Sequence, residues 1–216
     1  MRRWLLLVPA AFLVTGLAAA VGQPTGSAKA ASSPSPGTPP PEGVHVQVSD
    51  FQFDPTTIAL GRGQTVVFDF VGPSHHTATD GSGMALYDSG SVGPGEPSFS
   101  YTFPAAGGYR FTCTPHAFMG GRVEIPMRVR PATGDLQQTF SATWAASDAA
   151  VGYVYDVQIR RPGRRWVDWR VGVIARQSSF TPKAGKGTYA FRARMRSLSG
   201  GHALWSAATA IDVTRA

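Results

Sequence analysis

The loop Cys113-Thr114-Pro115-His116-Ala117-Phe118-Met119 contains the residues that decide the fold and the chemistry of this chain. A thiolate, an imidazole and a thioether follow one another at spacings of three residues. Sulfur ligands combined with imidazole are a donor set that copper prefers in proteins. The loop ends the strand expected at 109–113, and a tight turn there can direct three side chains at one centre, whereas a continuing strand would alternate them between two faces. We therefore predict that Cys113, His116 and Met119 bind one copper ion.

The fourth ligand must come from another part of the chain, where two adjacent histidines are candidates. His75 and His76 follow the apolar strand expected at 65–71 and the turn Gly72-Pro73. This order places them at one end of a β-sandwich, where loops meet. One such histidine would complete two imidazoles, a thiolate and a weak axial thioether, which is the ligand set of blue-copper electron-transfer sites.

Residues 44–129 resemble the cupredoxin family, and the 113–119 loop is most similar to that of amicyanin, with plastocyanin and pseudoazurin as relatives. Two further segments carry the resemblance, namely Ser74-His75-His76-Thr77 and the Pro94-Gly95-Glu96 turn before the strand at 99–103. The resemblance implies a Greek-key β-sandwich, one type 1 copper ion and electron transfer without catalysis.

The resemblance favours His76 over His75 as the ligand. In the family, the ligand is commonly followed by a polar residue, often Asn, that ties the two copper loops together. Thr77 occupies that place here, and its hydroxyl can supply the hydrogen bond. His75 is then a surface residue or a neighbour of the ligand.

Each ligand also has an ordinary interpretation when it is considered alone. A buried cysteine is often a small hydrophobic residue, Met119 could fill a core, and His116 could be a turn residue. An unpaired thiol in an exported chain invites oxidation, however, and a metal bond would occupy it. Zinc is a weaker alternative, because methionine is a poor zinc ligand.

The histidine and cysteine counts argue against an enzyme. The chain has five histidines and one cysteine. Multicopper oxidases need many more histidines for their oxygen-reducing cluster, and a dinuclear electron-transfer copper site needs two bridging cysteines. No nucleophile, base and orienting residue stand out as a group.

The N-terminal segment predicts export. Arg2 and Arg3 precede the apolar run 4–20, and Ala18 and Ala20 offer an A-x-A cleavage site, as in a secretory signal peptide at 1–20. An uncleaved membrane anchor is the alternative, because the run approaches spanning length. Residues 21–42 are rich in Pro, Ser and Ala and predict a disordered linker. We expect a secreted, cell-surface or periplasmic protein.

The remainder of the chain predicts two all-β domains. Short runs rich in Val, Phe, Tyr and Thr are broken by Gly and Pro residues, a composition typical of β-sandwiches. We assign 43–130 to the copper-binding cupredoxin domain, with a continuous strand expected at 122–129. We assign 131–216 to an immunoglobulin-like sandwich that resembles fibronectin type III domains through Trp144, the strand at 189–195 and Trp205.

Charge separates the two domains. Residues 43–130 hold five Lys/Arg and seven Asp/Glu, a net charge of −2, whereas residues 131–216 hold twelve Lys/Arg and five Asp, a net charge of +7. Arg192, Arg194 and Arg196 alternate with apolar residues and therefore lie on one outer face. This face could bind an anionic cell-surface polymer or lipid, or it could be only a solvated surface. Export argues against nucleic acid as the partner.

The resemblance also implies a redox partner protein that docks near His116, Pro115 and Phe118. Two other functions remain open from the residues alone. One is a protein that holds or delivers copper without transferring electrons. The other is a cell-surface binding or scaffold protein built on the second domain.

Overall fold

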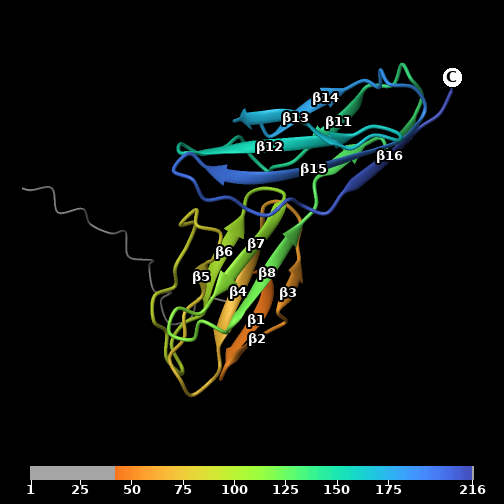
Figure 1. The fold of residues 1–216 in the computed structure, drawn as a ribbon. Coiled ribbons are helices and arrows are strands. Elements are labelled where there is room, and N and C mark those ends of the chain that lie inside the picture. The colour runs from red at the N-terminus through yellow and green to blue at the C-terminus, as the bar shows by residue number, and fades with distance from the viewer. Residues whose placement is uncertain (1–41, 216) are drawn as a thin grey trace, which may run out of the picture. The chain divides into compact units, whose positions relative to one another are not determined.

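The computed structural model describes residues 42–215, and every regular element among them is a β-strand (Figure 1). The expected all-β class is therefore confirmed. The predicted signal peptide at 1–20, and all of the predicted linker except Glu42, lie outside the described residues. Within 42–215 there is no helix long and apolar enough to cross a membrane.

The first sandwich contains two four-stranded sheets whose neighbours are mostly non-consecutive in the chain, as expected for a Greek-key arrangement. The pairs β1–β4 and β3–β8 are parallel, and the others are antiparallel. In sheet order, one sheet contains β2 (Gln52–Asp54), β1 (Val44–Ser49), β4 (Gln64–Phe70) and β6 (Phe99–Phe103). The other contains β3 (Thr57–Ala59), β8 (Gly120–Ile125), β7 (Gly107–Thr112) and β5 (Thr79–Asp80).

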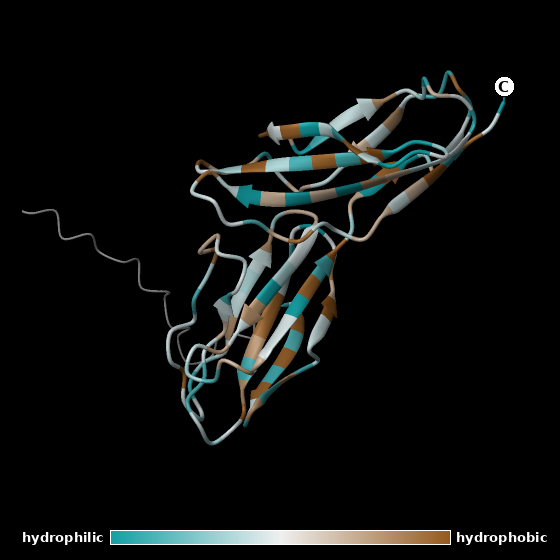
Figure 2. Ribbon diagram, in the orientation of Figure 1, coloured by the Kyte–Doolittle hydropathy of each residue, from teal (hydrophilic) through white to brown (hydrophobic). Residues whose placement is uncertain are grey.

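Alternation of apolar and polar residues determines which side chains enter the core of this sandwich. Figure 2 shows apolar and polar colours alternating along several strands. On β7, Tyr109 and Phe111 are buried while Arg110 is exposed. Because side chains two residues apart point to the same face, the next inward position is Cys113, which is fully buried. The strand pattern thus delivers the thiol to the interior at the end of β7.

The second sandwich is built from a five-stranded and a three-stranded sheet. Its core includes Trp144, Tyr189 and Phe191, all at most 1% exposed. In sheet order, the larger sheet contains β10 (Thr133–Gly134), β16 (Thr209–Val213), β15 (Gly187–Ser197), β12 (Tyr153–Arg160) and β13 (Trp166–Val173). The smaller contains β14 (Gln177–Phe180), β11 (Phe140–Thr143) and β9 (Arg128–Arg130).

The prediction of one continuous strand at 122–129 is wrong. The structure has two strands there, β8 ending at Ile125 and β9 beginning at Arg128. Pro126 has no N–H with which to continue a ladder, and proline is excluded from central strand positions for that reason. After this break the chain changes sheets, because β9 pairs with β11 rather than with β7.

Candidate metal centre

The loop between β7 and β8 is closed by its own backbone hydrogen bonds. The N–H of His116 donates to the carbonyl of Cys113 at 3.3 Å, and the N–H of Met119 donates to the carbonyl of His116 at 2.8 Å. The N–H of Cys113 donates back to the carbonyl of Met119 at 3.2 Å. These three bonds bring the first, middle and last residues of the loop together. Backbone hydrogen bonds therefore produce the predicted convergence of Cys113, His116 and Met119.

Three candidate donor atoms form a compact triangle at the end of the sandwich. The Cys113 Sγ lies 3.5 Å from the His116 Nδ1 and 3.7 Å from the His76 Nδ1. The two Nδ1 atoms are 3.2 Å apart. Cys113 and His76 are fully buried, and His116 is partly exposed.

The size of this triangle fits one metal ion. Imidazole and thiolate ligands bind zinc at about 2.0 Å and about 2.3 Å. With those lengths, planar trigonal coordination would place two nitrogens about 3.5 Å apart and each nitrogen about 3.7 Å from the sulfur. The observed separations of 3.2, 3.5 and 3.7 Å lie close to these values. Two imidazoles and a thiolate in this arrangement match a mononuclear copper site.

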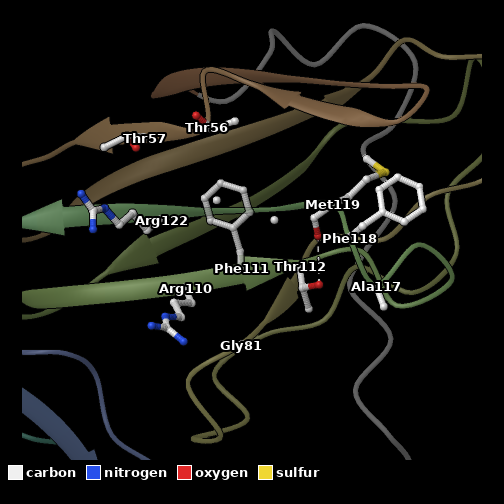
Figure 3. Close-up of a pocket in the computed structure, with 12 residues that line it drawn as sticks. Thr56, Thr57, Gly81, Arg110, Phe111, Thr112, Ala117, Phe118, Met119 and Arg122 are labelled. Atoms are coloured by element: carbon white, nitrogen blue, oxygen red, sulfur yellow. Dashed lines mark hydrogen bonds between the residues drawn. The ribbon is translucent and has the colours of Figure 1, made fainter.

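Met119 is the fourth predicted ligand, and the loop holds it in the interior. Its side chain is 2% exposed. Its carbonyl accepts the Thr112 hydroxyl at 3.0 Å, as the dashed line in Figure 3 marks. Because its N–H and carbonyl are both bonded within the loop, the backbone position of Met119 is fixed relative to Cys113 and His116.

The choice between the two histidines is resolved in favour of His76. Its N–H donates to the carbonyl of Val92 at 3.0 Å, and the N–H of Val92 donates to the carbonyl of His76 at 2.8 Å. This bridge holds His76 with its imidazole in the interior. His75 is exposed and lies 3.4 Å from the Ser91 hydroxyl, so its side chain points away from the triangle.

Thr77 ties the two copper loops together, in the place where the family resemblance led us to look for such a bond. Its hydroxyl accepts the N–H of Thr114 at 2.8 Å. The N–H of Thr77 also points to the Cys113 Sγ at 3.4 Å, a contact that no side-chain pattern could have revealed. A donor aimed at the sulfur stabilises the negative charge of the thiolate.

Asp50 is a residue of the site that the sequence did not predict. Its Oδ1 accepts the Nε2–H of His76 at 2.9 Å, and its Oδ2 accepts the Ser74 hydroxyl at 2.7 Å. The hydrogen bonds from His76 and then Ser74 lower the pKa of the Asp50 carboxyl below its ordinary value. The carboxylate comes from the turn between β1 and β2, where polar turn residues are common and carry no signal of a metal site.

An aromatic patch surrounds the exposed edge of His116. The Phe51 ring lies 4.8 Å from the His116 ring and 5.9 Å from the Phe118 ring. Phe51 is 49% exposed and Phe118 is 76% exposed. Figure 3 shows Phe118 and Ala117 beside a groove that runs along β7 and β8. The sequence analysis did not predict Phe51 as part of the site, because this residue is distant along the chain from the 113–119 loop.

Comparison with known proteins identifies the first domain. The family of copper binding proteins of the plastocyanin/azurin type matches residues 43–126. This segment is therefore a cupredoxin domain. His76, Cys113 and His116 could together hold a metal ion, and Met119 would complete the His₂CysMet ligand set of a type 1 copper site. Cupredoxins of this family carry electrons and are not enzymes.

Two solved structures illustrate the similarity. A purple cupredoxin from Nitrosopumilus maritimus is 16% identical with a TM-score of 0.36, and the match covers 38% of this chain and 98% of that protein. Amicyanin from Paracoccus versutus is 24% identical with a TM-score of 0.35, and the match covers 40% of this chain and 83% of that protein. No curated protein matches the chain.

Proposed function

We propose that the protein is an exported single-electron carrier that keeps its copper ion in both oxidation states. The observation that carries this proposal is the network that closes the ligand triangle. Copper bound there supplies a reversible exchange of one electron between Cu(II) and Cu(I). The residues of this chain would hold the ion, shield it from water and leave one ligand edge at the surface.

The rigidity of the ligand loops favours electron transfer over copper delivery. The 113–119 loop is bonded to itself, and Thr77 bonds it to the loop that carries His76. A site whose ligands are already locked by packing and hydrogen bonds changes little between oxidation states. A delivery site must instead open to release its ion.

Copper retention during redox cycling separates the two functions. We expect the full-length protein to undergo repeated reduction and reoxidation in the presence of a Cu(I) chelator with almost no loss of copper. Transfer of most of the copper to the chelator after the first reduction would favour delivery instead.

We propose that the redox partner docks on the aromatic patch formed by Phe51, His116 and Phe118, next to Pro115. Of the four predicted ligands, only His116 is partly exposed, so the edge of its imidazole would give an electron a short route between the copper ion and the surface. Aromatic rings around it would exclude water at the contact without a large interface, which suits brief encounters of small area. The exposures of Phe51 and Phe118 support this location.

Export remains a proposal that rests on the sequence of residues 1–20. Outside the cytoplasm an exposed free thiol would be oxidised. The single thiol of this chain is buried at the metal site, which would protect it in an exported protein. Mass spectrometry of the mature protein tests the predicted cleavage after Ala20, and an intact N-terminus in a membrane fraction would favour the anchor.

We propose that the second sandwich is a fibronectin type III-like domain. Trp144 is buried in its core. The Tyr189 hydroxyl donates to the carbonyl of Gly185 at 2.8 Å, four residues upstream, which is the hydrogen bond of a tyrosine corner. Trp169 packs edge-on against Trp144 with ring centroids 6.2 Å apart. These three features support the resemblance seen in the sequence.

The basic outer face of this sandwich supports a second, binding role. Arg192 lies over the rings of Trp166 and Trp205 at 4.5 and 5.0 Å, and Arg194 lies over Trp205 at 4.5 Å. Arg160 lies over Trp166 at 5.1 Å. Stacking fixes the guanidinium planes, together with the hydrogen bonds of Arg192 to the side-chain oxygen of Gln158 and the ion pair of Arg194 with Asp156. The remaining N–H groups of these arginines can bind anions. Arginines held in a row suit the repeated anionic groups of a polymer better than a fluid lipid surface.

Binding of dextran sulfate to the full-length protein tests this role. We expect salt-sensitive binding that is weakened much more by Arg160→Gln with Arg192→Gln than by Lys183→Gln with Lys186→Gln, which removes the same charge from the same sandwich. Equal losses in the two double variants would indicate a non-specific charge effect. Binding to anionic vesicles but not to dextran sulfate would point to lipid.

A further inference from the structure

The carboxylate of Asp50 joins a separate turn of the chain to the ligand His76. Asp50 lies between β1 and β2, whereas Ser74 and His76 follow β4. Besides the bonds to the His76 imidazole and the Ser74 hydroxyl, Oδ1 of Asp50 accepts the N–H of Ser74 at 3.2 Å. Three donors therefore fix the orientation of this carboxylate.

Gly72 provides the space that this arrangement needs. A Cβ atom at Gly72 would lie 2.7 Å from the Asp50 Oδ1 and 2.9 Å from the Asp50 backbone nitrogen. Real Cβ atoms essentially never approach other atoms so closely. The turn that holds Asp50 can therefore pack against the loop that holds His76 only because residue 72 has no side chain.

The hydrogen bond determines which nitrogen of His76 is available to a metal. A neutral imidazole carries one proton, and the carboxylate holds that proton on Nε2. The lone pair on Nδ1 is then directed at the triangle formed with Cys113 and His116. Because His76 is fully buried, water does not compete for the Nε2 proton. His116 is held differently, since its ring packs against Phe51.

We propose that Asp50 is a positioning residue of the copper centre, which holds His76 as the Nδ1 ligand and strengthens electron donation from its imidazole. This inference rests on the copper site and on the proposed electron-carrier function. A carboxylate that accepts the second N–H of a ligating histidine makes that histidine a more basic ligand. A more basic ligand favours Cu(II) over Cu(I), so Asp50 lowers the reduction potential.

The substitution Asp50→Asn tests this proposal in the full-length protein. Asparagine keeps the size and one acceptor oxygen but removes the charge. Loss of such a partner typically costs about 10–100-fold in metal affinity. If Cu(II) affinity falls about tenfold while Cu(I) affinity is unchanged, the potential rises by about 59 mV, the one-electron equivalent of a factor of ten.

Asp69→Asn is the matched control. Asp69 also pairs with a histidine of the same domain, His45, at 2.6 Å, and its other carboxylate oxygen accepts the Ser98 hydroxyl. The control removes the same charge and the same kind of carboxylate–imidazole pair, but its partner is not a copper ligand. We expect the potential and the copper affinity of this variant to remain close to those of the wild type.

A measurement without metal completes the test. In ¹⁵N NMR spectra of the copper-free wild type, we expect the His76 proton on Nε2, and we expect a mixture of tautomers in Asp50→Ala. Equal potentials for wild type and Asp50→Asn, or equal shifts for the Asp50 and Asp69 variants, would overturn the proposal. A wild type that forms no coloured Cu(II) complex would instead refute the copper function itself.

Discussion

Phe118→Glu separates a docking role of this side chain from a structural one. Because Phe118 is 76% exposed, only about a quarter of its side chain is covered. A fully buried aromatic ring removes about 150–250 Å² from water, so the covered part is about 50 Å². At about 25 cal/mol per Å², its loss costs about 1 kcal/mol of unfolding free energy. A core phenylalanine would cost about 3–5 kcal/mol.

The effect on electron exchange should be larger than the effect on stability. An unpaired polar group that is desolvated at an interface costs about 1–3 kcal/mol, and each 1.4 kcal/mol is about a factor of ten. We therefore expect exchange between Cu(I) and Cu(II) copies of the protein to slow by about 10–100-fold. The visible spectrum of the copper site should be nearly unchanged, because the Phe118 side chain is not a ligand.

NMR line broadening in mixtures of the two oxidation states measures this exchange, with urea unfolding measured in parallel. Val151→Glu is the control, since Val151 is fully exposed in the second sandwich and the substitution adds the same charge. An intact spectrum with an unchanged exchange rate would show that electrons leave by another face. A loss of the spectrum together with about 3–5 kcal/mol of stability would show that Phe118 is structural.

Four further substitutions test individual residues of the site. Thr77→Val should retain copper but lower the unfolding free energy of the copper-free protein by about 1–3 kcal/mol, because the N–H of Thr114 loses its acceptor; unchanged urea stability would contradict this role. Met119→Leu should retain copper and raise the reduction potential, since a weak axial donor stabilises Cu(II), and an unchanged potential in voltammetry would exclude an axial role. His76→Ala should abolish the Cu(II) colour while His75→Ala preserves it, and the reverse result in the absorption spectra would make His75 the ligand.

The three ligands in the 113–119 loop were predictable, because their spacing can be read within one short segment of the chain. Cys113, His116 and Met119 lie within one turn, and the side-chain alternation of β7 determines that the thiol points inward. The choice of His76 and the hydroxyl bond of Thr77 followed from the family resemblance, and the hydrogen bond at 2.8 Å confirms the latter.

The residues that support the site from a distance were not predictable. Asp50 and Phe51 are separated from His76 and His116 by 26 and about 65 positions, and only the pairing of β1 with β4 brings their turn to the copper loops. In the sequence, Asp50 and Phe51 look like an ordinary surface turn, because Asp is common in turns for local conformational reasons. The strand break at Pro126 was predictable in principle, because proline cannot donate to a ladder, but the sequence alone did not show that β9 joins another sheet.

The absorption spectrum of the full-length protein during titration with Cu(II) tests the copper assignment most directly. An intense visible band from the Cys113 thiolate should grow until one copper ion is bound per chain, because the chain has one cysteine. The band should be absent in Cys113→Ser. A colourless wild type, or a band that survives in Cys113→Ser, would contradict a copper centre made by Cys113, His116, His76 and Met119.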